Sequence, residues 1–148
     1  MPNGLGQASI NFVQNAVANG VDITTVNIMA MDYGAVANPN QMGQNAIDAT
    51  NAAVAQLAVV YPNRTLAQRR AMMGITPMIG LNDVAPEVFT LSDASQVLNF
   101  AQANNIGRLA MWSMTRDKSC PGTPTVSPVC SGIVQQPLAF SNVFKQFP

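Results

Sequence analysis

The sequence contains no histidine, a single glutamate (Glu87) and a single tryptophan (Trp112). The lack of histidine excludes Ser-His catalytic triads and most metal sites. No glycine-rich phosphate loop follows any apolar run, so the chain shows no nucleotide-binding signature and we expect no cofactor and no metal. A glycosidase with two catalytic carboxyl groups needs one that stays protonated near neutral pH, and no aspartate here sits in an obviously apolar pocket that would keep it protonated. The residues alone therefore do not indicate glycoside hydrolysis.

Charge is also scarce, with seven basic and seven acidic side chains and a net charge of zero. Because duplex nucleic acids are bound by strongly positive surfaces, we expect no nucleic-acid partner. The surface must be covered instead by Asn, Gln, Ser and Thr, whose neutral polar groups pair well with sugars. The same groups are equally compatible with a surface that only keeps the chain in solution.

No apolar run approaches the roughly 20 residues that a membrane-spanning helix requires. The first four residues, Met1 to Gly4, form neither a basic nor an apolar segment of a signal peptide, so we expect no membrane segment and no signal peptide in this chain. Only two cysteines are present, Cys120 and Cys130, and they flank a stretch rich in Pro, Thr and Ser. A disulfide between them would restrain this loop and would indicate a secreted protein. A reduced pair in a cytosolic protein is the alternative.

Apolar residues make up 48% of the 148 positions, enough for the core of one domain that spans residues 1–148. Three segments repeat one plan, in which a helical pattern leads to an apolar run that stops at polar residues. The expected helices cover residues 8–19, 41–60 and 91–101, with a basic turn at 64–72 and a closing amphipathic helix at 136–147. The expected strands cover residues 26–31, 74–81 and 108–114. Thr90 to Asp93 form an expected capping box at the start of the third helix.

Apolar strands that alternate with helices predict an α/β fold with a parallel sheet. Three strands with four or five helices form either a small doubly wound sheet or a segment of an eight-stranded barrel. In both, functional side chains gather at the carboxyl ends of the strands, which here carry Asp32, Asp83 and Asp117.

Each of these strand-end residues has a structural interpretation as well as a functional one. Asp83 and Asp117 are candidates for a site, but they could equally cap a following helix or pair with Arg116. Trp112 ends an apolar strand, where its flat ring could stack on a sugar or fill the core.

The motifs "VNIMAMDYG", "GITPMIGLNDVAPEVFTLSDASQVLNFAQANNIGRLAMWSMTRD" and "CSGI" together resemble the carboxyl-terminal part of bacterial family 18 glycoside hydrolases, the chitinases. The resemblance covers almost the whole chain. It implies a partial (β/α)8 TIM barrel in which the three strands are equivalents of strands six, seven and eight. The implied partners are chitin or N-acetylglucosamine oligosaccharides.

The resemblance also implies roles for single residues. In this family a tyrosine after strand six orients the acetamide group of the sugar and a tryptophan after strand eight forms the floor of the pocket. Tyr33 and Asp32 are the implied catalytic residues, because strand alternation places Tyr33 on the same face as Met31. In a second register, Met-x-Tyr-Asp, Met31 aligns with the tyrosine and Asp32 with the aspartate. The candidate sugar-contacting residues are Met31, Met78, Asn82, Asp83, Trp112 and Arg116.

One feature of the family is missing from this sequence. The catalytic acid of the family lies in a D-x-x-D-x-D-x-E motif after strand four, and no such motif occurs here; Glu87 follows strand seven. We therefore expect little hydrolysis by this chain alone, with a non-catalytic chito-oligosaccharide binder or a folding fragment as alternatives. Three parallel strands leave two unpaired edges, so we expect a homo-oligomer or association with the missing half of a barrel.

Overall fold

The computed structural model describes residues 2–123 and 125–148. Its centre is a parallel sheet of β1 (Val26–Ala30), β2 (Met73–Pro77) and β5 (Arg108–Leu109), in the order β1-β2-β5. Ile28 of β1 lies opposite Ile75 of β2, and Ile75 lies opposite Leu109 of β5. The predicted α/β class with a parallel sheet is confirmed. The third strand is shorter than expected, although an isolated bridge between Met78 and Trp112 continues its pairing with the segment after β2.

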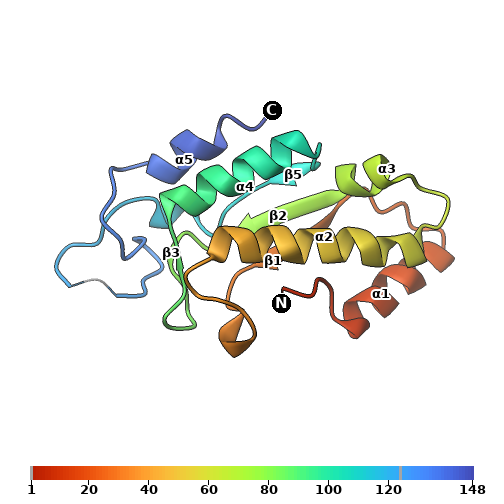
Figure 1. Cartoon of the computed structure of the whole chain (residues 1–148), viewed down its shortest axis with the longest axis horizontal. Coiled ribbons are helices and arrows are strands. Elements are labelled where there is room, and N and C mark those ends of the chain that lie inside the picture. The colour runs from red at the N-terminus through yellow and green to blue at the C-terminus, as the bar shows by residue number, and fades with distance from the viewer. Residues whose placement is uncertain (1, 124) are drawn as a thin grey trace.

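Helices lie beside this sheet and connect its strands. They are α1 (Gln7–Ala18), α2 (Met42–Val60), α3 (Leu66–Ala71), α4 (Leu91–Ala103) and α5 (Ala139–Phe144), with short 3-10 turns η1 (Gly34–Val36) and η2 (Met114–Arg116). Helix α2 contacts both β1 and β2 and packs against α4, which in turn packs against α5 (Figure 1). The predicted capping box is present at Thr90 and Asp93, and a second one at Thr65 and Gln68 starts α3.

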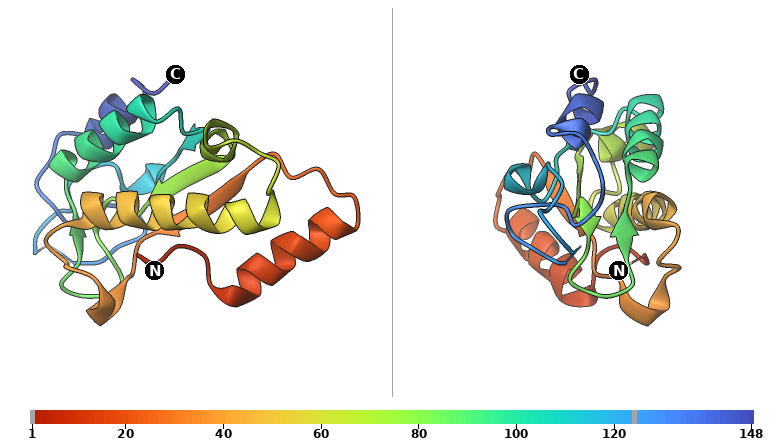
Figure 2. Two further views of the ribbon diagram at one scale, coloured as in Figure 1. Left: turned by 45° about the vertical axis from the view of Figure 1, so that its right-hand side comes forward. Right: turned by 90° about the vertical axis from the view of Figure 1, so that its left-hand side faces the viewer.

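The two faces of the sheet differ in burial. Ile28 and Ile75 point toward the helices and belong to the hydrophobic core. Alternate residues of β1 point the other way, and of these Met29 is 50% exposed and Asn27 is also exposed. Figure 2 (right) shows α2 and α4 together on one side of the sheet. We call the other side, lined by Asn27, Met29, Thr76 and Trp112, the open face.

The expected strand at 74–81 is interrupted, and this is a correction to the sequence prediction. The strand β2 ends at Pro77, and β3 (Gly80–Leu81) then turns to pair with β4 (Val88–Phe89) in an antiparallel hairpin. Gly80 has a φ of 75°, and a Cβ atom there would lie 2.0 Å from the carbonyl oxygen of Ser131. Only glycine fits such a close approach of two backbones. The closing helix is also shorter than predicted, because only residues 139–144 are helical.

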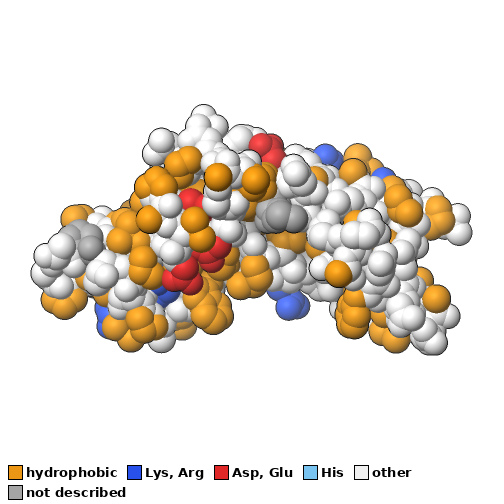
Figure 3. All heavy atoms as spheres, turned by 90° about the horizontal axis from the view of Figure 1, so that it is seen from below, with side chains coloured by type: hydrophobic (Ala, Val, Ile, Leu, Met, Phe, Trp, Pro, Cys, Tyr) orange, Lys and Arg blue, Asp and Glu red, His pale blue; other side chains and the backbone are white. Residues whose placement is uncertain are grey.

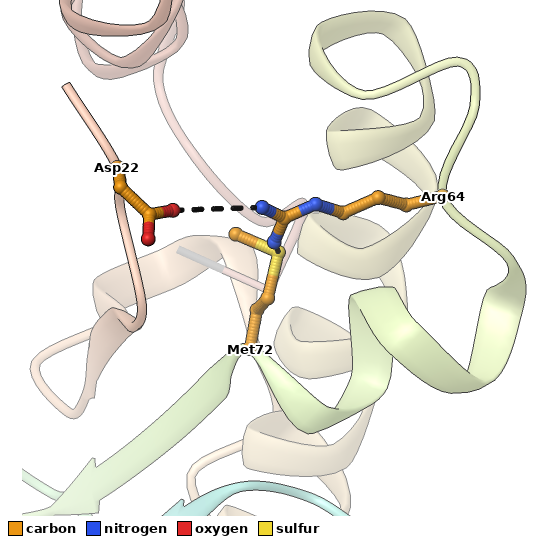
Figure 4. Close-up of polar contacts among 3 residues, drawn as sticks. All are labelled: Asp22, Arg64 and Met72. Atoms are coloured by element: carbon orange, nitrogen blue, oxygen red, sulfur yellow. Dashed lines mark hydrogen bonds and ion pairs between the residues drawn. The ribbon is translucent and has the colours of Figure 1, made fainter. Parts of the chain in front are cut away.

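A small polar cluster fixes the end of the molecule opposite the hairpin. Arg64 lies 3.8 Å from the carboxylate of Asp22 and contacts the sulfur of Met72 (Figure 4). Its guanidinium also stacks on the ring of Tyr61. The Asp22 side chain is 85% exposed, so solvent screens the pair and its contribution to stability is about 0–1 kcal/mol. The cluster joins the segment before β1 to the chain around α3, away from the carboxyl ends of the strands.

Candidate functional site

A cavity of about 260 Å³ lies at the carboxyl end of the parallel sheet. We call it the strand-end cavity, and four of the predicted site residues line it: Met78, Asp83, Trp112 and Arg116. The remaining lining comes from residues 126–128, a segment of the loop between the two cysteines. The tertiary structure thus brings together residues that are up to 50 positions apart in the sequence. Figure 3 views the molecule from below and shows acidic side chains gathered on one part of that face, with hydrophobic side chains around them.

Trp112 is the most accessible aromatic group of this cavity. Its side chain is 52% exposed, so it does not fill the core. Its backbone is fixed by two hydrogen bonds, since its N–H donates to Pro77 over 2.7 Å and its carbonyl accepts from Ile79 over 2.9 Å. An exposed indole ring on a fixed backbone offers a flat apolar face on which the C–H groups of a sugar ring can pack.

Two aspartates stand near the cavity. Asp83 is exposed and lines it, while Asp32 is half-buried and accepts a hydrogen bond from the N–H of Val84 over 3.2 Å. Both negative charges act on Arg116. Burial lowers the pKa of Arg116, and Asp83 and Asp32 act in the opposite direction. Asp83 is therefore the carboxylate of this cavity that remains free to accept a hydrogen bond from a ligand.

The Arg116 guanidinium is not available to bind a ligand, which differs from the sugar-contacting role expected for this residue. Its side chain is 1% exposed. The guanidinium donates to the carbonyl of Ile79 over 3.0 Å, to that of Leu81 over 2.5 Å, and to that of Ser127. It forms no ion pair with Asp83 or Asp117, and the carbonyl contacts occupy most of its donors. Arg116 is buried under the cavity as a structural group.

Asn82 also differs from the expectation. It is 2% exposed, and its amide nitrogen donates to the carbonyls of Met78 (2.9 Å) and Gly80 (3.1 Å). These bonds stabilise the bend between β2 and β3. A sugar cannot reach this side chain, so Asn82 shapes the backbone below the cavity.

Tyr33 lies away from the strand-end cavity, which is a second correction. Asp32 adopts a φ of 52°, and this left-handed residue turns the chain so that Tyr33 no longer follows the alternation of the strand. The Tyr33 side chain is 5% exposed and belongs to the hydrophobic core. Burial raises the pKa of its phenol, and the charges of Glu87 and Asp48 act in the same direction. In this chain the phenol packs in the hydrophobic core and does not line the strand-end cavity, so its implied role toward a sugar stays a prediction, while Met31 is half-buried.

Glu87 has a structural role that the sequence did not reveal. Its carboxylate is 3% exposed and accepts hydrogen bonds from the backbone N–H groups of Tyr33 (3.1 Å) and Gly34 (2.6 Å). The Asp32 carboxylate in turn accepts a hydrogen bond from the N–H of Val84. Hydrogen bonds from both segments therefore connect the turn after β1 to the loop of the β3-β4 hairpin. The single glutamate is thus engaged by backbone amides. Its position behind a Pro in a polar loop was the only hint in the sequence.

Asp117 caps the last helix, as one of its two interpretations predicted. It is 2% exposed and accepts hydrogen bonds from the N–H groups of Phe140 (3.0 Å) and Ser141 (2.7 Å) and from the Ser141 hydroxyl (2.6 Å). The predicted disulfide between Cys120 and Cys130 is present. Within residues 2–123 and 125–148, no group of three or more potential metal ligands gathers. In the same part of the chain, no helix has the length and apolarity needed to cross a membrane.

No model of a known protein family matches the sequence. The chain is, however, 40% identical over 157 residues to the probable bifunctional chitinase/lysozyme of Escherichia coli (strain K12), an alignment that covers 99% of this chain and 17% of that relative. It is also 43% identical over 124 residues to endochitinase 11 of Metarhizium anisopliae, covering 79% of this chain and 24% of that relative. This chain is related to chitinases.

The fold gives the same relationship to chitinases. The catalytic domain of a hyperthermophilic chitinase from Pyrococcus furiosus matches with a TM-score of 0.90 and 37% identity, over 99% of this chain and 47% of that one. Active-site mutants of active domain 2 of a thermostable P. furiosus chitinase, crystallised with chito-oligosaccharides, match equally well. The chain spans about half the length of these solved chitinase domains and less than a quarter of the curated relatives.

Proposed function

We propose that this chain supplies one wall of a chito-oligosaccharide site of the type found in family 18 glycoside hydrolases. The observation that carries the proposal is the half-exposed Trp112, whose backbone is fixed by hydrogen bonds and which lines the strand-end cavity together with Met78 and Asp83. The ring would stack on a sugar, and Asp83 would accept a hydrogen bond from a sugar hydroxyl or amide. The relationship to chitinases supports this ligand class.

The same proposal extends to the architecture, as a segment of a (β/α)8 barrel. Its support is the parallel order β1-β2-β5 with α2 and α4 on one face and exposed side chains on the other. A barrel places its helices outside and fills its interior with strand side chains, so Asn27 and Met29 would be interior residues.

Hydrolysis needs a proton donor that this sequence does not evidently supply. The D-x-x-D-x-D-x-E motif is missing, and the carboxylate of Glu87 is bound by two backbone amides. We infer that the chain binds chito-oligosaccharides without hydrolysing them by itself. Release of reducing sugar from colloidal chitin by the purified chain would contradict this inference.

The disulfide supports a location outside the cytoplasm, because such bonds persist in oxidising compartments. We therefore propose that the protein is secreted. A thiol assay on protein isolated from its native source should find no free cysteine.

Binding can be tested with the Trp112 fluorescence, because Trp112 is the only tryptophan. We expect the emission to shift on titration with chitotetraose, and not with cellotetraose, which lacks the acetamide groups. Calorimetry of Trp112→Ala should show an affinity loss of about 5- to 30-fold, since a stacked ring contributes on the order of 1–2 kcal/mol.

The matched control is Phe12→Ala, which removes an aromatic side chain that is 75% exposed on α1. This variant should bind as the wild type does. Affinity that survives Trp112→Ala would contradict the proposed role of Trp112. A well-folded wild-type chain with no affinity would indicate a folding unit without a ligand.

A further inference from the structure

The strand-end cavity has one side that comes from the loop between the cysteines rather than from the sheet. Val126, Ser127 and Pro128 line the cavity together with Trp112 and Met78. Val126 is 44% exposed and Pro128 is also exposed, so both present apolar groups to the cavity without being buried in the core. A ligand that stacks on Trp112 would meet this segment on its flank.

Polar contacts from η2 hold this segment in place. The Arg116 guanidinium donates to the carbonyl of Ser127, and the Thr115 hydroxyl donates to the carbonyl of Pro128 over 2.8 Å. The disulfide joins the two ends of the loop that contains this segment. Two adjacent residues of η2 therefore bind two adjacent carbonyls of the loop.

Arg116 joins this segment to the floor of the cavity as well. Its remaining donors bind the carbonyls of Ile79 and Leu81, which lie just beyond Met78 and just before the Asn82–Asp83 turn. A planar guanidinium can bind carbonyls on several sides at fixed angles, whereas a lysine ammonium acts as a point charge and cannot reproduce this geometry. One buried side chain thus connects residues 126–128 to the segment below the cavity.

We propose that residues 126–128 form a specificity-determining wall of an oligosaccharide subsite beside Trp112, and that Arg116 and Thr115 are the positioning residues of this wall. The inference rests on the proposed function, because the ligand class comes from it. Neither positioning residue needs to touch the sugar: Arg116 is buried, and the Thr115 hydroxyl is bound to the loop.

The test uses two readouts on the full chain. The first is the quenching of Trp112 fluorescence by acrylamide, which reports how far the wall covers the ring and needs no ligand. The second is the dissociation constant for chitotetraose. Thr115→Val removes the hydrogen bond to Pro128 at an exposed position, and should raise both the quenching constant and the dissociation constant, the latter by about 2- to 10-fold. Thr115→Ser keeps the hydroxyl and should restore both values.

Arg116→Lys should have a larger effect in the same direction. If that variant does not fold, Thr115→Val and the double variant Cys120→Ser/Cys130→Ser, which frees the loop, still test the proposal. The control is Val134→Ala, which truncates a side chain that is 96% exposed beyond the loop. It should change neither readout.

The outcomes separate this proposal from the proposed function. A wild-type chain that does not bind chitotetraose would overturn the function, while the quenching series would still report on the wall. Unchanged quenching and affinity in folded Thr115→Val and in the double cysteine variant would contradict the proposal that residues 126–128 form a wall of the subsite. A fall in melting temperature without a change in either readout would also contradict it, because it would make Thr115 a merely structural residue.

Discussion

At Asp32 the backbone takes a φ of 52°, and the residues on its two sides point in different directions. Met31 stays at the edge of the open face, whereas Tyr33 enters the hydrophobic core. Aspartate tolerates this left-handed conformation better than most residues, and its carboxylate is held by the N–H of Val84. One backbone angle therefore decides that Tyr33 is a core residue.

The Tyr33 hydroxyl is buried and has no hydrogen-bond partner among the described residues. Because an unsatisfied buried polar group costs about 1–3 kcal/mol, Tyr33→Phe should leave the free energy of unfolding unchanged or raise it. Chitotetraose affinity should not change. Urea unfolding and calorimetry would measure the two quantities, and a large loss of affinity would restore the phenol as a ligand-orienting group.

The raised pKa of Tyr33 also predicts a pH dependence. The unfolded chain releases the phenol proton near pH 10, before the folded protein does. Below that pH the phenol is protonated in both the folded and the unfolded chain, so its ionisation does not affect stability. Above that pH the free energy of unfolding should fall by up to about 1.4 kcal/mol per pH unit. Urea unfolding between pH 8 and 11 should show this extra slope in the wild type and not in Tyr33→Phe. Equal slopes would mean that Tyr33 ionises normally.

Among the elements, α5 depends on a group far from it in sequence. The helix has six residues, follows a left-handed Leu138 and receives no cap from its own N-terminal residue. A helix this short is unstable by itself. Asp117 supplies the missing cap from 22 positions before the helix starts, and Phe140 anchors the helix in the core.

Asp117→Ala should therefore lower the free energy of unfolding by about 2–4 kcal/mol, since it leaves several buried donors unsatisfied. Denaturant unfolding would measure the loss. Asp48→Ala is the matched control, because Asp48 is exposed and only accepts a hydrogen bond from Gln44. It should change stability by less than about 0.5 kcal/mol. Similar losses in the two variants would mean that the cap is not needed.

Elements marked by a regular spacing or a continuous run of apolar residues were predictable from the sequence. Elements that depend on contacts between residues far apart in the sequence were not. Helix α2 carries apolar residues at helical spacing, and strands β1 and β2 lie in near-continuous apolar runs, so all three could be predicted from the sequence. The β3-β4 hairpin was missed because "GITPMIGL" has no polar side chain other than Thr76, and the change of direction follows from the approach of Gly80 to Ser131. That approach is a tertiary contact between residues 51 positions apart in the sequence.

At the scale of the whole molecule, the open face is the main unfilled surface. Met29 is 50% exposed on a strand whose outer edge pairs with no other strand among the described residues. An unpaired edge can add a strand of another chain, and an exposed apolar side chain on the face beside it is then stabilised by burial against that chain. We expect the chain, when studied alone at micromolar concentration, to associate with a second copy through this face.

Met29→Lys should weaken this association, because a charge on the open face opposes its burial. Light scattering would give the mass of each variant, with Val59→Lys as the control. Val59 is 71% exposed on α2, on the helical side of the sheet. A wild-type chain that remains monomeric, or an equal effect of the two substitutions, would show that the open face does not mediate association.

The sequence by itself determined the α/β class, the parallel strands, the capping box at Thr90 and the placing of Trp112 at a strand end. All of these depend on residues close together in the chain, where spacing and residue type suffice. Only the tertiary structure decided which strand-end residues a ligand can reach. Tyr33 is buried in the core, Arg116 and Asp117 are buried and hydrogen-bonded to distant segments, and Asn82 is buried and bound by the carbonyls of Met78 and Gly80, while Trp112 and Asp83 remain accessible. Accessibility is a property of the assembled fold, because it depends on what other segments bring to each side chain.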